Sequence, residues 1–553
     1  MPRLTSSHRA SPDASRTPTA PLRRQELGLA TLLFLALAFV IYGWYAFHGG
    51  FVADDWVNAD HYYFHPESGF WGAVDNYQTP SRPVAAVYVT LTYATMGIHY
   101  HPHLILAVLL TAFLSIAFFA FLRTLGLGWV WALAAAALLL VFPSSDSTRF
   151  WTTGSQIDLF IGMYLFAAVI AVYGRRRYGP DPTLRAVATQ VAASTLAVAA
   201  VAGYEIVAPA VLLSFVLYRW VGKGGVLWRW LCDAIPTLLV LWFFTRKFGG
   251  GAAHGHQLIT NVRLVAEGST QVLSYTFVPV RELSRWPVFF AVAAVIAVAV
   301  LAAWRAGGDR RREAIGRWGR PLLLAVGAIA IGYAMIVPAA DRYPIYAPGV
   351  QNRTNCFAAL GLCLLAVFVA AAVAAIVAAV VPRISERSRD RLRDVIAGVL
   401  IGGLFLAYTV RIVEDEQRWT KSAEVQAQVL AGTHQLVPSP PPEATIFTSP
   451  YPGYSSPSLP IFGGGGNNDQ LGAFKVSYDQ EDLRAFPILE GQEICGAKTV
   501  AVSDAGNSPT DYGKAILVDF RTSKVYRPRN RAQCLRVTRA MEPFGPVNLS
   551  DDW

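Results

Sequence analysis

Long apolar runs recur along this chain and constrain its fold more than any other feature. Between residues 27 and about 412, apolar stretches alternate with short polar segments, and roughly 20 apolar residues cross about 30 Å of hydrocarbon as a helix. Only 15% of the residues are charged, against about 25% in ordinary soluble domains. Because lipid satisfies no backbone polar group, the runs must be helices or strands of a closed barrel. They lack the alternation of apolar and polar residues that marks barrel strands, so helices are predicted. The sequence therefore predicts an all-α polytopic membrane protein.

The apolar runs define a transmembrane domain at 27–412, preceded by a polar N-terminal segment. Residues 1–26 are rich in Ser, Pro and Arg, which predicts a disordered cytoplasmic segment. The first apolar run is too long for a signal-peptide core and lacks a small-residue cleavage site, so we expect an uncleaved anchor. About eleven spans are predicted, at 27–47, 103–122, 128–142, 156–173, 184–201, 206–218, 230–245, 287–304, 321–337, 356–381 and 395–412.

The C-terminal segment, 413–553, has mixed polarity and Pro and Gly turns, which favours a small α/β or α+β domain. Short strands are predicted at 444–449, 498–504 and 514–520. Of the five cysteines, only Cys495 and Cys534 share this polar region, so they are the only pair expected to be able to form a disulfide.

Positive residues are concentrated on alternate polar segments. Clusters such as Arg175–Arg177 and Arg310–Arg312 fall on one predicted side, whereas the short loops of the other side contain only Arg82, Arg149, Arg342 and Arg353. The positive-inside rule therefore predicts a multi-pass protein of the cell (inner) membrane with a cytoplasmic N-terminus. An odd number of spans places 413–553 outside the cytoplasm. The formal charge of +10 is thus a topology signal, and no nucleic-acid partner is predicted.

Two adjacent carboxylates, Asp54 and Asp55, follow the first span in the predicted outer loop. Ordinary solvation of a loop explains such a pair. The alternative is an acid or base held at the membrane surface beside a substrate tethered in lipid. Trp56 and the aromatic residues nearby also fit an interfacial belt, so they do not decide between the two interpretations.

The pattern around these residues resembles the GT-C superfamily of polytopic glycosyltransferases, especially its O-mannosyltransferase-like branch. The resemblance covers roughly residues 27–360. It begins with an acidic pair and Trp after the first span, then Arg-Pro before an aromatic helix, then a His at the second span. The matching residues are Asp54, Asp55, Trp56, Arg82, Pro83 and His103.

Three later segments extend the resemblance, each at a predicted outer helix end. They contain Trp151, Gly154 and Asp158, then Glu205 and Pro209, then Asp341, Arg342 and Tyr343. The chain departs from the family's pattern at Leu106, Gln156 and Tyr204, so the identity of the sugar stays open.

The resemblance implies a GT-C-like fold and transfer of a monosaccharide from a polyprenyl-phosphate carrier, with inversion, to an envelope lipid, glycan or protein. A carboxylate at Asp54 or Asp55 would act as the base, and we favour Asp55. Planar guanidinium donors suit the departing phosphate, which makes Arg342 or Arg353 the first candidate and Arg82 the reserve. Supporting or substrate-binding positions would be Trp56, His103, Asp158, Glu205 and Tyr343.

Other roles stay open for several of these residues. Arg342 can pair with Asp341 or anchor at lipid headgroups, and Glu205 can complement a helix dipole. His99, His101 and His103 match no strong zinc signature, so no metal site is predicted. A divalent ion that bridges a carboxylate and the donor phosphate stays open. Competing functions are a transporter or flippase of lipid-linked sugars and a noncatalytic partner in envelope assembly.

Overall fold

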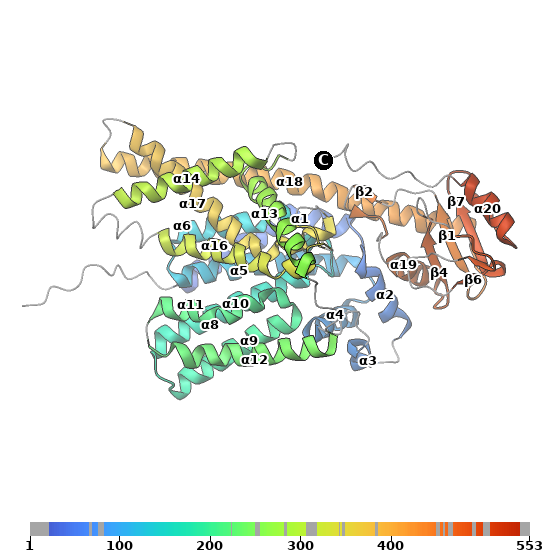
Figure 1. Ribbon diagram of the computed structural model, residues 1–553, viewed down its shortest axis with the longest axis horizontal. Helices are drawn as coiled ribbons and strands as arrows, with labels where there is room; N and C mark the ends of the chain where they lie inside the picture. Colours follow the sequence, from blue (N-terminus) through green and yellow to red (C-terminus); the bar gives the residue numbers. More distant parts are fainter. Residues whose placement is uncertain are drawn as a thin grey trace, which may run out of the picture.

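A computed structural model describes residues 22–65, 69–75, 82–222, 224–248, 255–280, 285–305, 318–341, 343–345, 349–381, 385–449, 454–456, 459–462, 468–488, 494–500 and 509–541. Helices dominate it (Figure 1). The long helices are α1 (Arg24–His48), α5 (Tyr100–Leu125), α8 (Gln156–Tyr178), α9 (Leu184–Gly203), α12 (Val226–Phe248), α13 (Gly255–Phe277), α14 (Arg285–Arg305), α16 (Arg320–Ala334), α17 (Cys356–Val380) and α18 (Glu386–Leu436).

Shorter helices lie between the long ones, mostly where the chain turns. They are α2 (Asp54–Phe64), α3 (Gly69–Asp75), α4 (Pro83–Met96), α6 (Trp129–Leu140), α7 (Ser147–Phe150), α10 (Ala208–Leu212) and α11 (Ser214–Val221). Four 3₁₀ segments accompany them, at η2 (Pro143–Ser145), η3 (Glu205–Val207), η5 (Val337–Ala339) and η6 (Gly349–Asn355).

The prediction of a polytopic helical membrane protein is confirmed. In the described part of the chain, eight helices are long and apolar enough to cross a membrane, and three shorter apolar helices accompany them. One predicted span, 206–218, is wrong as a single helix, because η3, α10 and α11 share these residues. The physical reason is local: Tyr204 is extended and ends α9, and Pro209, which lacks an N–H, is confined to the first turn of a new helix.

The helices pack around a core in which α8 contacts α5 and α9, α1 contacts α5, and α17 contacts α16 and α18. Small residues allow close approach between helices. A Cβ at Gly332 of α16 would lie 2.6 Å from the backbone nitrogen of Ala358 in α17. Such small-residue contacts are typical of helix pairs in membranes, where lipid offers no hydrophobic drive for association.

The C-terminal region is built around one four-stranded sheet of order β4-β1-β7-β8. Strand β1 (Thr445–Ser449) is parallel to β4 (Arg484–Pro487) and β7 (Ala515–Asp519), and β7 is antiparallel to β8 (Lys524–Tyr526). Both central strands are buried along their whole length, which agrees with their continuous apolar sequences. The remaining elements are α19 (Asn468–Tyr478), α20 (Arg531–Ala540), η7 (Tyr512–Lys514) and the pairs β2 (Tyr454–Ser456) with β3 (Leu459–Pro460) and β5 (Thr499–Val500) with β6 (Thr510–Asp511).

The predicted features of this region are largely found. The predicted strands at 444–449 and 514–520 are β1 and β7, while β5 covers two residues of the third. Cys495 and Cys534 form a disulfide, as expected. The predicted boundary at residue 412 falls inside α18, which continues from the transmembrane domain to the strands without a break. The C-terminal region lies at one end of the helical bundle, beside α2 (Figure 1), and α19 packs on α2.

Candidate functional site

A cavity of about 320 Å³ lies among the short segments that connect the long helices. Five parts of the chain contribute to it: the start of α2, the residue before α4, the turn between α7 and α8, the end of α9 with η3, and the stretch from the end of α16 to η6. The polar and aromatic residues in its wall are Asp54, Asn58, Arg82, Trp151, Thr153, Gln156, Tyr204, Glu205, Tyr343, Arg353 and Thr354. Convergent polar groups in a cavity of this size are typical of a small-molecule site.

The two adjacent carboxylates have different surroundings. Asp55 is completely buried and accepts hydrogen bonds from the backbone N–H of Thr153 (2.7 Å), the Thr153 hydroxyl (2.6 Å) and the backbone N–H of Val52 (3.0 Å). Burial raises the pKa of Asp55 to about 6, although these hydrogen bonds act in the opposite direction. Its carboxylate therefore fastens the start of α2 to the turn before α8.

Asp54 is half-buried and its side chain lines the cavity. Burial raises the pKa of Asp54 above its ordinary value, and the positive charges of Arg353 and Arg82 lower it in part. Asn58, one helical turn further along α2, also lines the cavity and donates to the Thr153 hydroxyl (3.1 Å). Asp54 is thus the member of the pair that a bound molecule can reach.

Arg82 forms an ion pair with Glu205 on one wall of the cavity. Its Nε and Nη2 atoms donate to the two carboxylate oxygens of Glu205 at 2.8 and 2.6 Å, and its guanidinium lies 4.3 Å from the centre of the Tyr204 ring. Burial opposes ionisation of Glu205, yet the Arg82 charge and hydrogen bonds hold its pKa below the ordinary value. The charge of Arg82 is therefore largely balanced within the protein.

Arg353 also contributes a positive charge to the cavity, but its guanidinium contacts aromatic rings. Its guanidinium lies over two aromatic rings, 4.8 Å from the centre of Trp151 and 5.5 Å from that of Tyr343. Among the residues that the structure describes, no carboxylate forms an ion pair with Arg353. Arg342 lies outside the described residues. Of the described arginines in the cavity, Arg353 is therefore the one best able to bind a phosphate.

The remaining candidates lie around the cavity and not in its wall. Trp56 donates its indole N–H to Gln426 of α18 (2.8 Å). His103 is buried, hydrogen-bonds the Gly97 carbonyl (2.9 Å) and packs on Phe51 and Tyr93.

Two acidic candidates are also held by neighbouring side chains. Asp158 is buried in α8 and accepts from Thr111 (3.2 Å), whereas Asp341 accepts from Gln257 (3.0 Å) and Asn261 (3.4 Å). Neither residue lines the cavity.

The histidine cluster is not arranged as a metal site. His101 hydrogen-bonds the Ala46 carbonyl at 3.2 Å, while His103 bonds the carbonyl of Gly97. Within the described ranges, no group of three or more His, Cys, Asp or Glu is placed to hold a metal ion.

Several residues of the cavity wall were not expected from the sequence. Asn58 follows Asp54 by four residues, a spacing that puts both on one face of a helix, but the segment was interpreted as a loop. Thr153 and Thr354 have no sequence signal, because small hydroxyl residues are common in every loop. Their role becomes visible only when distant segments are brought together.

No protein-family model matches the chain, and no curated protein sequence matches it. Two proteins of known structure align with most of this chain. One is the arabinofuranosyltransferase AftD from mycobacteria, with 14% identity over 85% of this chain and a TM-score of 0.42. This chain spans about a third (32%) of the length of AftD.

The other is ArnT from Cupriavidus metallidurans. Its undecaprenyl-phosphate complex covers 82% of this chain and 89% of that protein, with 14% identity and a TM-score of 0.38. Its apo state has 13% identity and a TM-score of 0.39.

Proposed function

We propose that this protein is a membrane glycosyltransferase that moves a monosaccharide from a polyprenyl-phosphate carrier to a hydroxyl acceptor in the cavity described above. One observation carries the proposal: the Asp54 carboxylate and the Arg353 guanidinium, which has no carboxylate partner in the described part, line the same cavity. Arg353 lies over Trp151 and Tyr343, whose flat rings also offer stacking surfaces to a sugar.

In the proposed reaction, the acceptor oxygen attacks the anomeric carbon from the face opposite the phosphate. Asp54 takes the acceptor's proton as the new bond forms, and the bond between the anomeric carbon and the phosphate oxygen breaks. The lipid phosphate leaves with that electron pair, and the configuration is inverted. General-base catalysis contributes about 10² to 10⁴ in rate. A guanidinium stabilises the charge that develops on the phosphate.

The raised pKa of Asp54 fits a base, because a carboxyl of higher pKa accepts a proton more readily once it is ionised. Glu205 is the less suitable base in the cavity, since its carboxylate is engaged at both oxygens by Arg82. We therefore assign the base to Asp54. Asp55, which the sequence analysis favoured, is proposed to hold the Thr153 turn.

The proposal includes the membrane setting. The carrier chain lies in the lipid, and the N-terminus faces the cytoplasm of a cell whose inner membrane holds the protein. The cavity and the C-terminal domain then face the other side. An envelope lipid, glycan or protein supplies the acceptor hydroxyl. The distribution of arginines along the chain supports this orientation.

The test compares membranes that contain the wild type or Asp54→Asn, supplied with a radiolabelled polyprenyl-phosphate sugar pool. Asp54→Asn is expected to lower transfer into envelope material at least about 10²-fold, because the amide cannot take a proton. Asp75→Asn, which changes an exposed carboxylate on α3, is the matched control and is expected to keep full transfer. Full transfer by a correctly inserted Asp54→Asn protein would refute the proposal.

A further inference from the structure

One stripe of the surface of helix α18 is linked by hydrogen bonds to both sides of the cavity. Trp419 and Gln426 are separated by seven residues, so they lie two turns apart, about 10 Å along one helix face. Both side chains are buried. Neither lines the cavity. Gln426 hydrogen-bonds Trp56 of α2, the helix that begins at the cavity, whereas Trp419 hydrogen-bonds Asp146, which lies outside the cavity wall.

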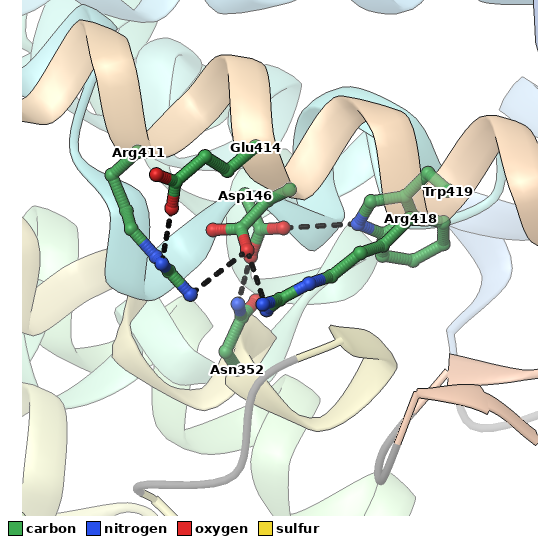
Figure 2. A network of polar contacts seen from close by, with 7 residues as sticks. Asp146, Asn352, Arg411, Glu414, Arg418 and Trp419 are labelled. Carbon is green, nitrogen blue, oxygen red and sulfur yellow. Dashed lines mark hydrogen bonds and ion pairs between the residues drawn. The ribbon is translucent and has the colours of Figure 1, made fainter. Parts of the chain in front are cut away.

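The first contact leads to Arg353. The Trp419 indole N–H donates to one carboxylate oxygen of Asp146 (2.9 Å), and the side-chain amide of Asn352 donates to the other. Figure 2 shows Asp146 between Trp419 of α18 and Asn352 of η6. The Asn352 oxygen accepts the backbone N–H of Ser147 (3.1 Å), so this side chain is fixed at both ends. Arg353 is the next residue along the chain.

Further hydrogen bonds hold the same segment in place. Asn355 donates to the carbonyls of Ser144 (2.9 Å) and Ile345 (2.8 Å), and Tyr333 donates to Asn355 (3.1 Å). Arg411 and Arg418 of α18, which Figure 2 also labels, are both within ion-pair distance of Asp415 of their own helix. The bond from Trp419 to Asp146 is therefore a link from α18 across to the η6 segment.

The second contact leads to Asp54. Gln426 accepts the indole N–H of Trp56, two residues after Asp54. Between the two contact points, α18 approaches the loop before α2 so closely that a Cβ at Gly50 would lie 2.9 Å from the Cβ of Ala423. The start of α2 is thus held against the same helix face.

We infer that α18 sets the separation between the carboxylate and the guanidinium of the site, with Trp419 and Gln426 as positioning residues for Arg353 and Asp54. The inference rests on the proposed function. Neither residue touches the reacting atoms. A misplacement of about 1 Å in a catalytic group costs on the order of 10²-fold in rate, which makes such fixed contacts consequential.

The experiment measures binding of undecaprenyl phosphate to the purified full chain. Trp419→Phe keeps an aromatic ring but removes the indole N–H, and Asn352→Leu removes the amide that donates to Asp146 without adding a charge. Both are expected to weaken binding about tenfold or more, because Arg353 loses its fixed position. Asn352→Leu adds no charge beside Arg353 and leaves α18 unchanged, so it decides the outcome if Trp419→Phe does not fold.

Tyr408→Phe is the matched control for this arm. Tyr408 is also a fully buried aromatic residue of α18, and its hydroxyl donates to Thr276, away from the cavity. The control is expected to bind like the wild type. If Arg353→Gln abolishes binding while Trp419→Phe and Asn352→Leu do not weaken it, the inference is wrong and the proposed function stands. If Arg353→Gln binds normally, both are wrong.

The second arm uses Trp56→Phe and Gln426→Leu, which break the same hydrogen bond from opposite ends. Both are expected to lower turnover about tenfold and to leave undecaprenyl phosphate binding unchanged. The reason is that the start of α2, which holds Asp54, shifts, whereas the η6 segment, which holds Arg353, does not. A merely structural role of α18 predicts parallel loss of binding and turnover in every variant, and that pattern would overturn the inference.

Discussion

At the scale of single residues, neighbours in sequence have different environments. Successive residues of a helix point about 100° apart, so Asp54 faces the cavity while Asp55 turns into the protein. The sequence shows the acidic pair but cannot choose between its members. That choice depends on Thr153, a residue about 100 positions away whose N–H and hydroxyl engage Asp55.

The charge of Arg353 leads to a pH prediction for Asp54. Because a positive charge nearby lowers the pKa of a carboxyl, replacing Arg353 by Gln is expected to raise the pKa of Asp54. A base must be deprotonated to act, so the acidic limb of the kcat/KM profile should move to higher pH. Arg353→Lys keeps the charge and should leave the limb near its wild-type position. An unmoved limb in Arg353→Gln would exclude Asp54 as the group that titrates there.

At the scale of elements, the long membrane helices were predictable and the short segments of the site were not. A run of 20 apolar residues has one stable state in lipid, whatever its neighbours. The segments α2, η3, α10 and α11 are short, and their starts depend on single residues and on contacts with distant parts of the chain. The cavity is made of these segments, which explains why its residues were predicted only in part.

The hydrogen bonds of buried polar groups within the membrane helices could not be predicted from the sequence either. Asp233 of α12 accepts hydrogen bonds from Gln190, Ser194, Ser214 and Tyr218, which come from α9 and α11. Four donors compensate the cost of burying one carboxylate, so Asp233 links three helices. A pattern of this kind is read from the packed structure and not from the sequence.

The contact between α19 and α2 gives a prediction at this scale. A Cβ at Gly472 would lie 2.5 Å from the carbonyl oxygen of Trp56, so Gly472→Ala must push α2 away from α19. Overpacking of this kind costs about 1–3 kcal/mol. Thermal unfolding of the purified protein should show this loss of stability, and transfer activity should also fall. Gly513→Ala, where a Cβ meets nothing within 4 Å, should change neither.

At the scale of the whole molecule, the C-terminal domain is part of the site's framework. It packs on α2 through α19, and Lys475 lies 3.6 Å from Asp60 of that helix. The domain therefore adjoins the helix that begins at Asp54. Composition indicated a separate domain, but its place beside the cavity depends on the continuous course of α18.

The disulfide gives a prediction about orientation. Disulfides persist in oxidising compartments, so Cys495–Cys534 should be intact in cells only if the domain faces away from the cytoplasm. In denatured whole-cell extracts, both cysteines should resist a maleimide reagent until a reductant is added, whereas Cys232, Cys356 and Cys363 should react at once. Removing the bond by Cys534→Ser should cost about 2–4 kcal/mol in the domain. Immediate labelling of both residues would reverse the orientation proposed above.

The length of α18 determines how far from the lipid tails the proposed chemistry would take place. Its 51 residues extend about 75 Å, whereas roughly 20 residues suffice to cross the hydrocarbon. Trp419 and Gln426 follow the last residue of the predicted span, 412, by about 10 and 20 Å of helix rise. The sugar would then react at or above the layer of lipid headgroups. In the proposed reaction, the isoprene units nearest the phosphate would leave the hydrocarbon to deliver the sugar, and the acceptor would react in a hydrated, polar layer.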